Sequence, residues 1–535
     1  MPERMRPLDM TFLTRESAST PMHVATLDIF DPPADGFDYQ RLVALIHDRL
    51  AFLPRYRQRV RMLPGQLVNP VWVDDAAFDL GYHVRRSSLP RPGSLEQLRE
   101  LVARIMSRRL DRNRPLWETY VVEGLDGDRF AILTKSHQVL VDGTTVDLGQ
   151  LILDDSPDVP PTPEVHWDAE RAPNGVELLL ESVTESLRHP AVAADNIRGQ
   201  LVTAGQLAIR ARDLLSAIVP RQVVSSSGPL ETVLSEQRRF ATVETRLSAY
   251  RTIRAALGGS VNDVILATIA GALRAWLLTR ADPAASSTRI RALVPMSVVD
   301  DEFAQPTSLG SQVTPHLLTL PLSETSPIMR LHQVSYAFKT HQETGRAVGA
   351  TRLTKVAGFA PTTFHMIGSR VAAVASGRAF DLVLTNVPGP QFPLYAAGAR
   401  MLASYPVLPL LAGHALAIGV TSYDGKVFYG LDADRDALPD LEVLGSCIGE
   451  ALDELLEASS STRDRAPRGR VPTKASTKKA TTKEPAATKA TTKKPAATKA
   501  TTKKPAAKKP AGKKPAGKKA AKKVATKRTT TARKR

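Results

Sequence analysis

Apolar residues recur at helical spacing after Ser94, which predicts an amphipathic helix over residues 95–110. Ser94 and Gln97 have the spacing of a capping box, in which two side chains satisfy free backbone N–H groups at a helix start. Residues 111–115 interrupt the pattern, and residues 117–122 are then expected to be extended.

A second helical pattern covers residues 262–278. Asn262 is its expected N-cap, and Asp263 suits the positive end of the helix dipole. Residues 386–390 are expected to form a rigid loop and not regular structure. They contain two prolines, which lack N–H donors, and one glycine, which bends freely.

The end of the second half has β-type patterns. Runs at 414–423 and 426–431 are joined by Asp424-Gly425, a strong signal for a two-residue hairpin. A closing helix is predicted over 441–456. The length of 535 residues predicts two domains plus additional segments.

A segment rich in Pro and Asp, residues 155–173, predicts a connector between two halves. Residues 176–218 follow with spacing that indicates two apolar and basic helices. Two interpretations remain open for them: packing on the rest of the protein, or contact with an anionic membrane surface. The expected parts are an N-terminal domain over 1–155, a connector and helical segment over 156–240, a C-terminal domain over 241–458 and a tail over 459–535.

Basic charge is concentrated in the tail. Residues 463–535 hold 27 Lys and Arg against two acidic residues, a net charge of +25, so the whole-chain value of +18 leaves the rest at −7. The tail repeats Lys, Ala, Thr and Pro with almost no apolar side chains, which predicts disorder. It resembles the tails of linker histones and mycobacterial histone-like proteins, which implies non-specific binding to nucleic acid or anionic lipid by counterion release. A solubilising tail without a partner is the alternative.

Three further features bear on location. Cys447 is the single cysteine, which excludes an internal disulfide and suits a reducing compartment. Residues 1–10 are charged and precede no signal-type apolar stretch, and no apolar run reaches the length needed to span a bilayer. We expect a cytoplasmic protein, peripheral to membrane or lipid inclusions.

The clearest candidate chemistry lies in residues 135–143, Lys-Ser-His-Gln-Val-Leu-Val-Asp-Gly. The apolar run at 130–133 predicts a short buried strand ahead of it, and Asp142-Gly143 predicts a turn. A histidine at such a strand end can accept a proton from an attacking hydroxyl, because its ordinary pKa is near 6.5. A structural role for His137 is the alternative.

Several other short motifs accompany this segment in a fixed order. They are Pro7-Leu8-Asp9, Phe12-Leu13, 20–24, Arg114-Pro115-Leu116-Trp117-Glu118, 261–267, Val294-Pro295-Met296-Ser297, 385–390 and 422–425. In these motifs and their order the chain resembles the bacterial wax ester synthase/diacylglycerol acyltransferases. The resemblance covers about residues 5–458, all of the chain except the tail.

This resemblance implies a fold like that of chloramphenicol acetyltransferase, with two α/β domains and an active-site tunnel between them. The implied reaction moves a fatty acyl group from acyl-CoA, a co-substrate, to diacylglycerol or a long-chain alcohol. The family signature is two adjacent histidines, three variable residues and Asp-Gly, and its second histidine is the general base. His137, Asp142 and Gly143 match the signature, whereas Gln138 occupies the position of the second histidine.

Gln138 changes the expected mechanism. A glutamine amide can donate and accept hydrogen bonds, but it cannot take up a proton near neutral pH. Neighbouring residues of a strand point to opposite faces, so His137 is expected to face away from the tunnel unless the backbone bends. Losing a general base typically costs about 100-fold to 10,000-fold in rate, which predicts weakened activity.

Two more positions depart from the family pattern. Val299 stands where an arginine is expected to pair with Asp142, and Asp300 and Asp301 follow it. Ser311 stands after Gly310, where asparagine is common. These departures also favour a specialised or degenerate site.

Four residues are candidates for substrate binding through the same resemblance. Trp117 is expected in the tunnel lining or the core, Asn262 and Asp263 near the active site or in helix capping alone, and Asn386 in a loop beside the tunnel or a simple turn. No cofactor or metal site is predicted, because the sequence has no phosphate-binding glycine loop and no paired-ligand spacing among its eleven histidines.

Two functions follow from this pattern. The first is an O-acyltransferase that makes triacylglycerol or wax ester, with activity weakened by Gln138. The alternative is a catalytically weak lipid-binding or tethering protein whose basic tail binds DNA or anionic membrane.

Overall fold

The computed structural model describes residues 3–62, 70–140, 147–160, 167–174, 230–280, 289–297, 312–344, 351–352 and 380–465, with isolated positions at 177, 228, 365 and 370. The chain forms two units, residues 1–467 and 468–535, and every described residue lies in the first. Several predicted features lie outside the described residues: Asp142, Gly143, Val299, Ser311, the helices predicted within 176–218 except position 177, and residues 466–535 of the tail. Residues 459–465, predicted as the start of the tail, belong instead to the closing helix, which runs over Leu441–Arg465.

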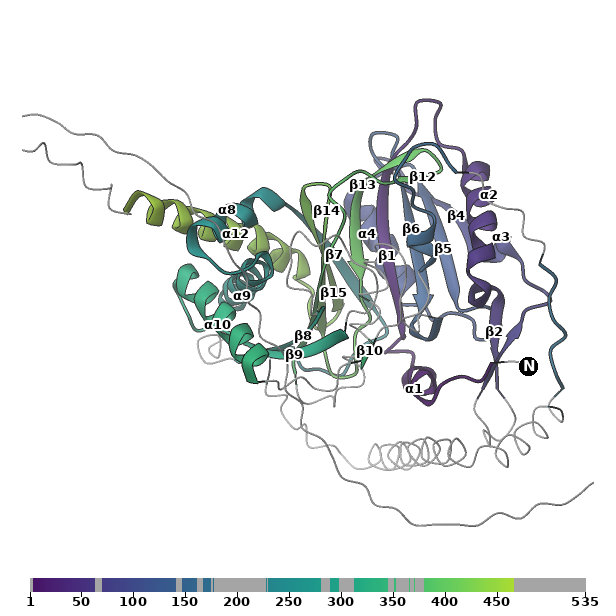
Figure 1. Ribbon diagram of the computed structural model, residues 1–535, viewed down its shortest axis with the longest axis horizontal. Coiled ribbons are helices and arrows are strands. Elements are labelled where there is room, and N and C mark those ends of the chain that lie inside the picture. Colours follow the sequence, from purple (N-terminus) through teal and green to yellow (C-terminus); the bar gives the residue numbers. More distant parts are fainter. Residues whose placement is uncertain are drawn as a thin grey trace, which may run out of the picture. The chain divides into compact units, whose positions relative to one another are not determined.

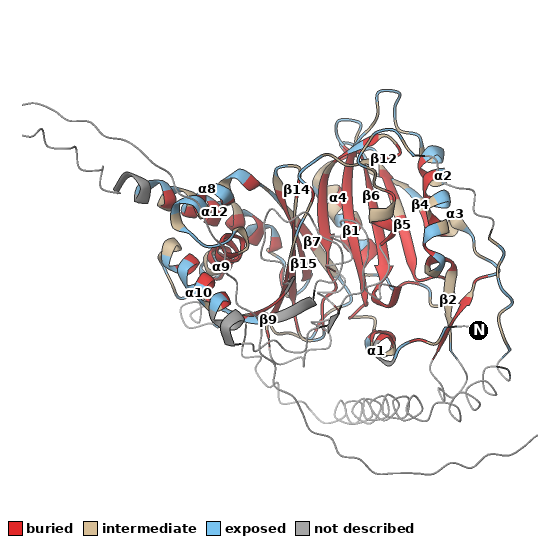
Figure 2. Ribbon diagram, viewed as in Figure 1, coloured by how far each residue is buried: buried red, intermediate tan, exposed pale blue. Residues whose placement is uncertain are grey.

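The first of two large sheets is built mainly from the N-terminal half. It has six strands in the order β12 (Tyr395–Ala396), β13 (Ala399–Val407), β1 (His23–Asp31), β6 (Phe130–His137), β5 (Trp117–Glu123) and β4 (Val84–Ser88). β1 and β6 have a neighbouring strand on both edges, and they are buried along almost their whole length (Figure 2). β13, although it belongs to the C-terminal half of the sequence, pairs with β1.

The second sheet has seven strands from the C-terminal half. Their order is β10 (Thr351–Arg352), β9 (Gln312–Leu320), β8 (Ile290–Ser297), β11 (Leu382–Pro388), β14 (Leu416–Tyr423), β15 (Lys426–Asp434) and β7 (Arg238–Arg246). A separate two-stranded sheet joins β2 (Gln58–Arg61) to β3 (Val71–Asp74).

Helices accompany both sheets (Figure 1). In the N-terminal half they are α1 (Pro7–Arg15), α2 (Tyr39–Arg49), α3 (Leu80–His83), α4 (Leu95–Met106) and α5 (Leu148–Leu151), with 3-10 turns at Leu50–Phe52, Pro54–Arg57 and Gln138–Leu140. In the C-terminal half they are α8 (Leu247–Leu257), α9 (Val261–Thr279), α10 (Pro327–Thr344) and α12 (Leu441–Arg465). The described residues form two large apolar cores, of which the first combines residues from both halves of the sequence and the second comes from the C-terminal half.

The predicted helix after Ser94 is confirmed as α4, which is shorter than expected and ends at Met106. Ser94 accepts from the Gln97 N–H and Gln97 accepts from the Ser94 N–H, so the capping box is present. The extended segment 117–122 and the strand at 130–133 are confirmed as parts of β5 and β6.

The second predicted helix is confirmed as α9, but its cap differs. Ser260, not Asn262, is the N-cap, and it forms a capping box with Asp263. The side chain of Ser260 reaches the N–H of Asp263, so Asn262 lies within the first turn and its side chain is not needed there. Among the described helices, α9 alone is long and apolar enough to cross a membrane, and most of it is buried inside the second core.

The predicted hairpin is confirmed as β14 and β15. Asp424 and Gly425 join the strands with φ of 44° and 79°, the left-handed pair that a type I′ turn requires. The expectation that 386–390 lacks regular structure is wrong for its first part, because β11 continues to Pro388. Among the described residues, β8 pairs with β11 only at Leu382 and Val383. Within that part of the chain, Pro388 therefore lies where one edge of β11 has no partner strand, and a missing N–H is tolerated there.

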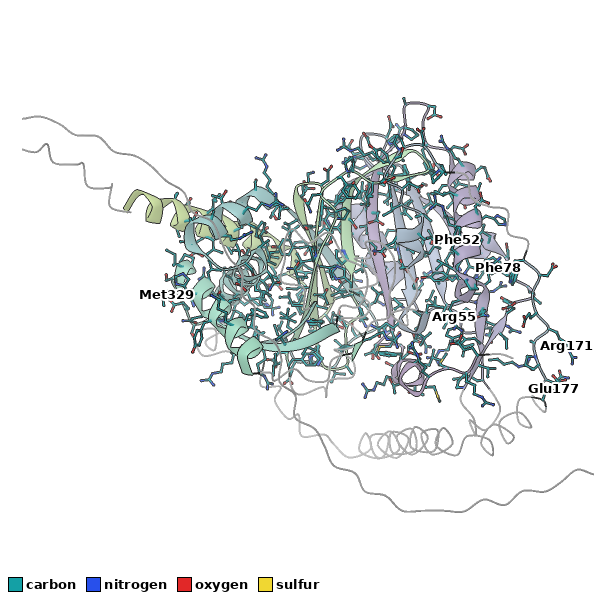
Figure 3. All side chains as sticks on the ribbon, viewed as in Figure 1. Phe52, Arg55, Phe78, Arg171, Glu177 and Met329 are labelled. Atoms are coloured by element: carbon teal, nitrogen blue, oxygen red, sulfur yellow. The ribbon has the colours of Figure 1, made fainter. Side chains whose placement is uncertain are left out.

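Large apolar side chains also reach the surface of the described residues. Phe52 is 52% exposed and Met329 is 47% exposed. They lie on opposite sides of the view in Figure 3, so these two do not belong to one patch.

Candidate active site

The signature segment lies where β6 ends. The N–H of His137 donates to the Leu116 carbonyl at 2.9 Å, and the N–H of Gln138 donates to the Met22 carbonyl at 3.0 Å. A single 3-10 turn then begins at Gln138. Hydrogen bonds from both sides of β6 therefore fix the backbone at the two residues from which chemistry was expected.

The ring of His137 is buried and neutral. Its Nδ1 accepts the N–H of Val139 at 3.2 Å, which leaves the ring proton on Nε2. Nε2 lies 3.7 Å from Oε1 of Glu16, and both side chains are only 1% exposed. Burial lowers the pKa of His137 to about 4, although Glu16 opposes this shift. With its proton on Nε2, the ring has no free lone pair for an attacking hydroxyl.

Glu16 is held by an arginine that the sequence analysis did not single out. Arg112 donates to Oε2 of Glu16 from Nε at 3.1 Å and from Nη2 at 2.6 Å, and the Met22 N–H donates to Oε1 at 3.3 Å. Such charge-assisted bonds are short and strong, and they fix the orientation of the Glu16 carboxylate. Glu16 follows the Phe12-Leu13 motif and Arg112 precedes the motif that begins at Arg114. This closeness to two family motifs is the one feature of the sequence that could have pointed to them.

The side chain of Gln138 is fully buried. Neither Oε1 nor Nε2 has a hydrogen-bond partner within the described part of the chain. A buried amide without partners costs about 1–3 kcal/mol for each unsatisfied group. A substrate hydroxyl, which both donates and accepts, would satisfy this amide.

Ser136 and Lys135, the two residues directly before His137, both have polar partners. Ser136 Oγ lies 3.2 Å from Oδ1 of Asp147, which also accepts from the Tyr56 hydroxyl at 2.7 Å. Lys135 Nζ donates to the Ile105 carbonyl at 3.0 Å near the end of α4, and burial lowers its pKa to about 8. These contacts anchor β6 to its surroundings.

Trp117 lies in the first core. It is fully buried, donates from Nε1 to the Tyr56 carbonyl at 2.7 Å, and stacks on the His83 ring at a centroid distance of 4.6 Å. This environment agrees with the core interpretation of Trp117.

Two of the predicted substrate-binding residues lie together. Nδ2 of Asn386 on β11 donates to Oδ1 of Asn262 on α9 at 2.9 Å. The buried Asp263 side chain accepts from the Ser260 N–H, which is the capping role. The structure therefore joins Asn262 to Asn386 and gives Asp263 a structural contact.

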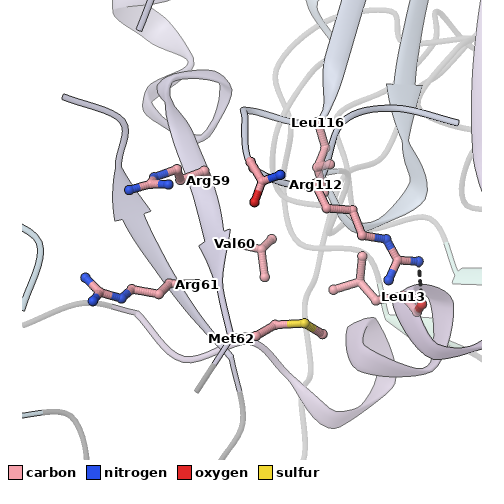
Figure 4. A pocket seen from close by; sticks show the side chains of 8 residues that line it. Leu13, Arg59, Val60, Arg61, Met62, Arg112 and Leu116 are labelled. Atoms are coloured by element: carbon pink, nitrogen blue, oxygen red, sulfur yellow. Dashed lines mark hydrogen bonds between the residues drawn. The ribbon is translucent and has the colours of Figure 1, made fainter. Parts of the chain in front are cut away.

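A pocket of about 410 Å³ is lined in part by Arg112 and Leu116, two residues that contact Glu16 and His137. Val60 and Met62 on one wall face Leu13, Arg112 and Leu116 on the other, while the Arg59 and Arg61 side chains extend from the opposite side of β2 (Figure 4). Asn113 completes the lining. Leu116 accepts the His137 N–H and Arg112 binds Glu16, so one layer of residues separates the pocket from His137.

Metal ligands do not cluster in the part of the chain that the structure describes: no three His, Cys, Asp or Glu side chains there could hold an ion together. The end of β6 therefore presents two groups that can position a substrate: the amide of Gln138 and the neutral imidazole of His137.

Two family models cover most of the folded chain. The wax ester synthase/diacylglycerol acyltransferase catalytic domain matches residues 5–265, and the C-terminal domain of the same family matches residues 309–456. The chain belongs to the wax ester synthase/diacylglycerol acyltransferase family.

Members of this family are similar along most of the chain. A putative diacylglycerol O-acyltransferase of Mycobacterium tuberculosis is 32% identical over 463 residues, 85% of this chain and 99% of that protein. A second protein of that organism, the probable diacylglycerol O-acyltransferase tgs3, is 41% identical over 261 residues, 48% of this chain and 96% of its own length.

A solved family structure shows the same architecture. The wax ester synthase/diacylglycerol acyltransferase of Marinobacter aquaeolei VT8 aligns with a TM-score of 0.59 and 26% identity, over 85% of this chain and all of that chain. The predicted two-domain fold of the chloramphenicol acetyltransferase type is thereby confirmed, and with it membership of an acyltransferase family.

Proposed function

We propose that this chain transfers a fatty acyl group from acyl-CoA to the hydroxyl of diacylglycerol or a long-chain alcohol, with Gln138 positioning the acceptor and a slow chemical step. The observation that carries the mechanism is the fully buried Gln138 amide, whose two polar atoms have no partner among the described residues. It stands where the family signature has its base.

Positioning is much of what this reaction needs. A thioester is already reactive, and holding both reactants in line lowers the barrier by several kcal/mol without a proton acceptor. The acceptor hydroxyl can donate to Oε1 of Gln138 and accept from Nε2. The amide cannot remove the proton, and His137 has its own ring proton on the nitrogen that faces Glu16. The hydroxyl oxygen therefore attacks the thioester carbonyl while oriented but not activated. The C–S bond breaks, and the hydroxyl proton ends on the departing CoA thiolate, which leaves as free thiol.

The pocket beside His137 supports a lipid substrate. Leu13, Val60, Met62 and Leu116 give it apolar walls, and its volume of about 410 Å³ is in the range of small-molecule sites. We assign it to the apolar part of a substrate whose reacting end lies at Gln138. Methionine suits such a wall because its unbranched side chain adapts to the chain that it contacts.

The proposal also covers where the protein works and what its basic tail binds. Acceptors of this kind are lipids, so the enzyme works at a membrane or lipid-inclusion surface on the cytoplasmic side. Residues 463–535, with a net charge of +25, bind anionic lipid or nucleic acid without sequence preference. Acyl-CoA serves as co-substrate, and no resident cofactor is required.

Release of free thiol from palmitoyl-CoA tests this function, with diacylglycerol and with hexadecanol as acceptors. Wild-type protein is expected to turn over slowly, and Gln138→His is expected to raise kcat by about 100-fold, since general bases contribute about 100-fold to 10,000-fold. Gln40→His, at an exposed position, is the matched control and is expected to leave kcat unchanged.

His137→Asn separates the two possible bases. Asparagine keeps an acceptor for the Val139 N–H but cannot hold a proton, so the slow wild-type rate is expected to persist within a few fold. Loss of all activity in His137→Asn, together with no gain in Gln138→His, would show that His137 is the base and would refute the proposed role of Gln138.

A further inference from the structure

We propose that Arg370 is a positioning residue for acyl transfer, in which its guanidinium, held by Asp9, fixes the backbone carbonyl of Gln138 and thereby the direction of the Gln138 amide. This inference rests on the proposed function, because the amide that it orients is the group that positions the acceptor. It adds a residue from the C-terminal half to a site otherwise built from the N-terminal half.

The guanidinium of Arg370 contacts the end of β6 and two residues of α1. Nη1 donates to the carbonyl of Gln138 at 2.8 Å, Nη2 donates to Oδ1 of Asp9, and the guanidinium carbon lies 4.9 Å from the centre of the Phe12 ring. The two nitrogens of a planar guanidinium have a fixed separation, so the contact with Asp9 determines where the other nitrogen meets Gln138.

Asp9 is itself held in place. Its other carboxylate oxygen accepts from Nε of Arg6 at 2.9 Å, and the Asp9 side chain is 6% exposed. Asp9 and Phe12 belong to α1, so Arg370 ties that helix to the end of β6. A buried charge of this kind costs free energy unless it is paired, and the pairing with Asp9 offsets that cost.

The Gln138 backbone is thereby fixed at both of its polar groups. Its N–H donates to Met22 and its carbonyl accepts from Arg370. These bonds hold the peptide units on both sides of the Gln138 Cα, so a change in the backbone torsions of Gln138 would break at least one of them and would turn its side chain. Without Arg370 the carbonyl would lose a charged donor in a buried location.

The charge of Arg370 also acts on His137. Arg370, Arg112 and Lys135 disfavour the protonated ring, Glu16 favours it, and burial is the largest influence on its low pKa. His23 faces His137 from the neighbouring strand β1. Removing the charge of Arg370 is therefore expected to raise the pKa of His137, whereas a lysine at 370 would keep it low.

The experiment compares Arg370→Met and Arg370→Lys in wild-type protein and in the Gln138→His background. Thiol release is measured while palmitoyl-CoA is varied, and His137 is titrated by NMR, with His137→Asn to assign its signal. Arg330→Lys is the matched control: Arg330 is also a buried arginine paired with a carboxylate, Glu454, but it belongs to α10 in the second core.

We expect Arg370→Met to lower kcat by about 10-fold to 100-fold in both backgrounds with little change in KM, because misplacement of about 1 Å costs this much. Arg370→Lys is expected to recover part of kcat. The pKa of His137 should rise in Arg370→Met but not in Arg370→Lys. Arg330→Lys should leave kcat and the His137 titration unchanged even where it lowers stability.

A folded Arg370→Met protein with kcat within twofold of its parent would overturn the inference. If neither background turns over, the proposed function fails separately, and the titration decides about Arg370: an unchanged His137 pKa in Arg370→Met would exclude the placement argued for its guanidinium.

Discussion

Asn386 on β11 donates a hydrogen bond of 2.9 Å from Nδ2 to Oδ1 of Asn262 in the first turn of α9. The two residues are 124 positions apart in the sequence, and each lies in one of the ordered motifs. Their bond connects the N-terminal end of the main core helix to a central strand of the second sheet. Because β8 leaves β11 after Val383, this side-chain bond supports the part of β11 that has one strand neighbour.

The Asn pair is expected to contribute to stability as one unit. Asn262→Ala and Asn386→Ala should each lower the free energy of unfolding by about 1 kcal/mol, because each removes the hydrogen bond between the two amides. The double variant should lose less than the sum of the two, with a coupling of about 0.5–1.5 kcal/mol, in urea unfolding experiments. Asn174→Ala, at an exposed position, is the control. Strictly additive losses would argue against the bond.

Local elements could be predicted well where a short spacing decides the structure. Ser94 and Gln97 are three residues apart and meet within one helical turn, so sequence alone identified the cap of α4. Ser260 and Asp263 have the same spacing and cap α9, whereas a capping preference considered one residue at a time favours Asn262, which lies between them. The extension of β11 to Pro388 depended on which neighbours pair with it, and no local pattern contains that information.

The site was predictable in part for the same reason. The signature at 137–138 is contiguous, and the sequence alone identified the replacement of a base by Gln138. Glu16, Arg112 and Arg370 reach this segment from three distant parts of the chain. Their roles follow from tertiary contacts, which residue spacing along one sequence does not record. The direction in which the His137 side chain points likewise depends on how the backbone turns at the end of β6, which residue spacing does not determine.

The pocket can be tested by filling it. Val60→Trp should raise KM for palmitoyl-CoA or for a long-chain acceptor by about 10-fold, because the larger ring occupies space assigned to the apolar part of a substrate. Shorter substrates should be affected less. Val233→Trp is the matched control, since Val233 is 91% exposed. Kinetics measured over a series of chain lengths check the prediction, and an equal effect at every length would contradict it.

A buried carboxyl group predicts the pH dependence of stability. Asp28 lies in the middle of β1, is buried, and burial raises its pKa to about 7, with a bond to Ser404 as the opposing influence. The folded protein therefore keeps a proton that the unfolded chain releases near pH 3.8. The stability that this proton provides is complete below about pH 3.8 and is lost as the pH rises through 7.

Asp28→Asn replaces the protonated carboxyl with a neutral amide of similar shape. Its stability advantage over wild type should grow between about pH 4 and 7 and then stay constant, reaching about 1–3 kcal/mol at pH 8. Urea unfolding at pH 5 and pH 8 measures both values, and Asp31→Asn at the exposed end of the same strand is the control. If Asp28→Asn were less stable than wild type at pH 8, the Asp28 carboxylate would have to be ionised and paired in the fold, and the sign of the predicted pH dependence would be reversed.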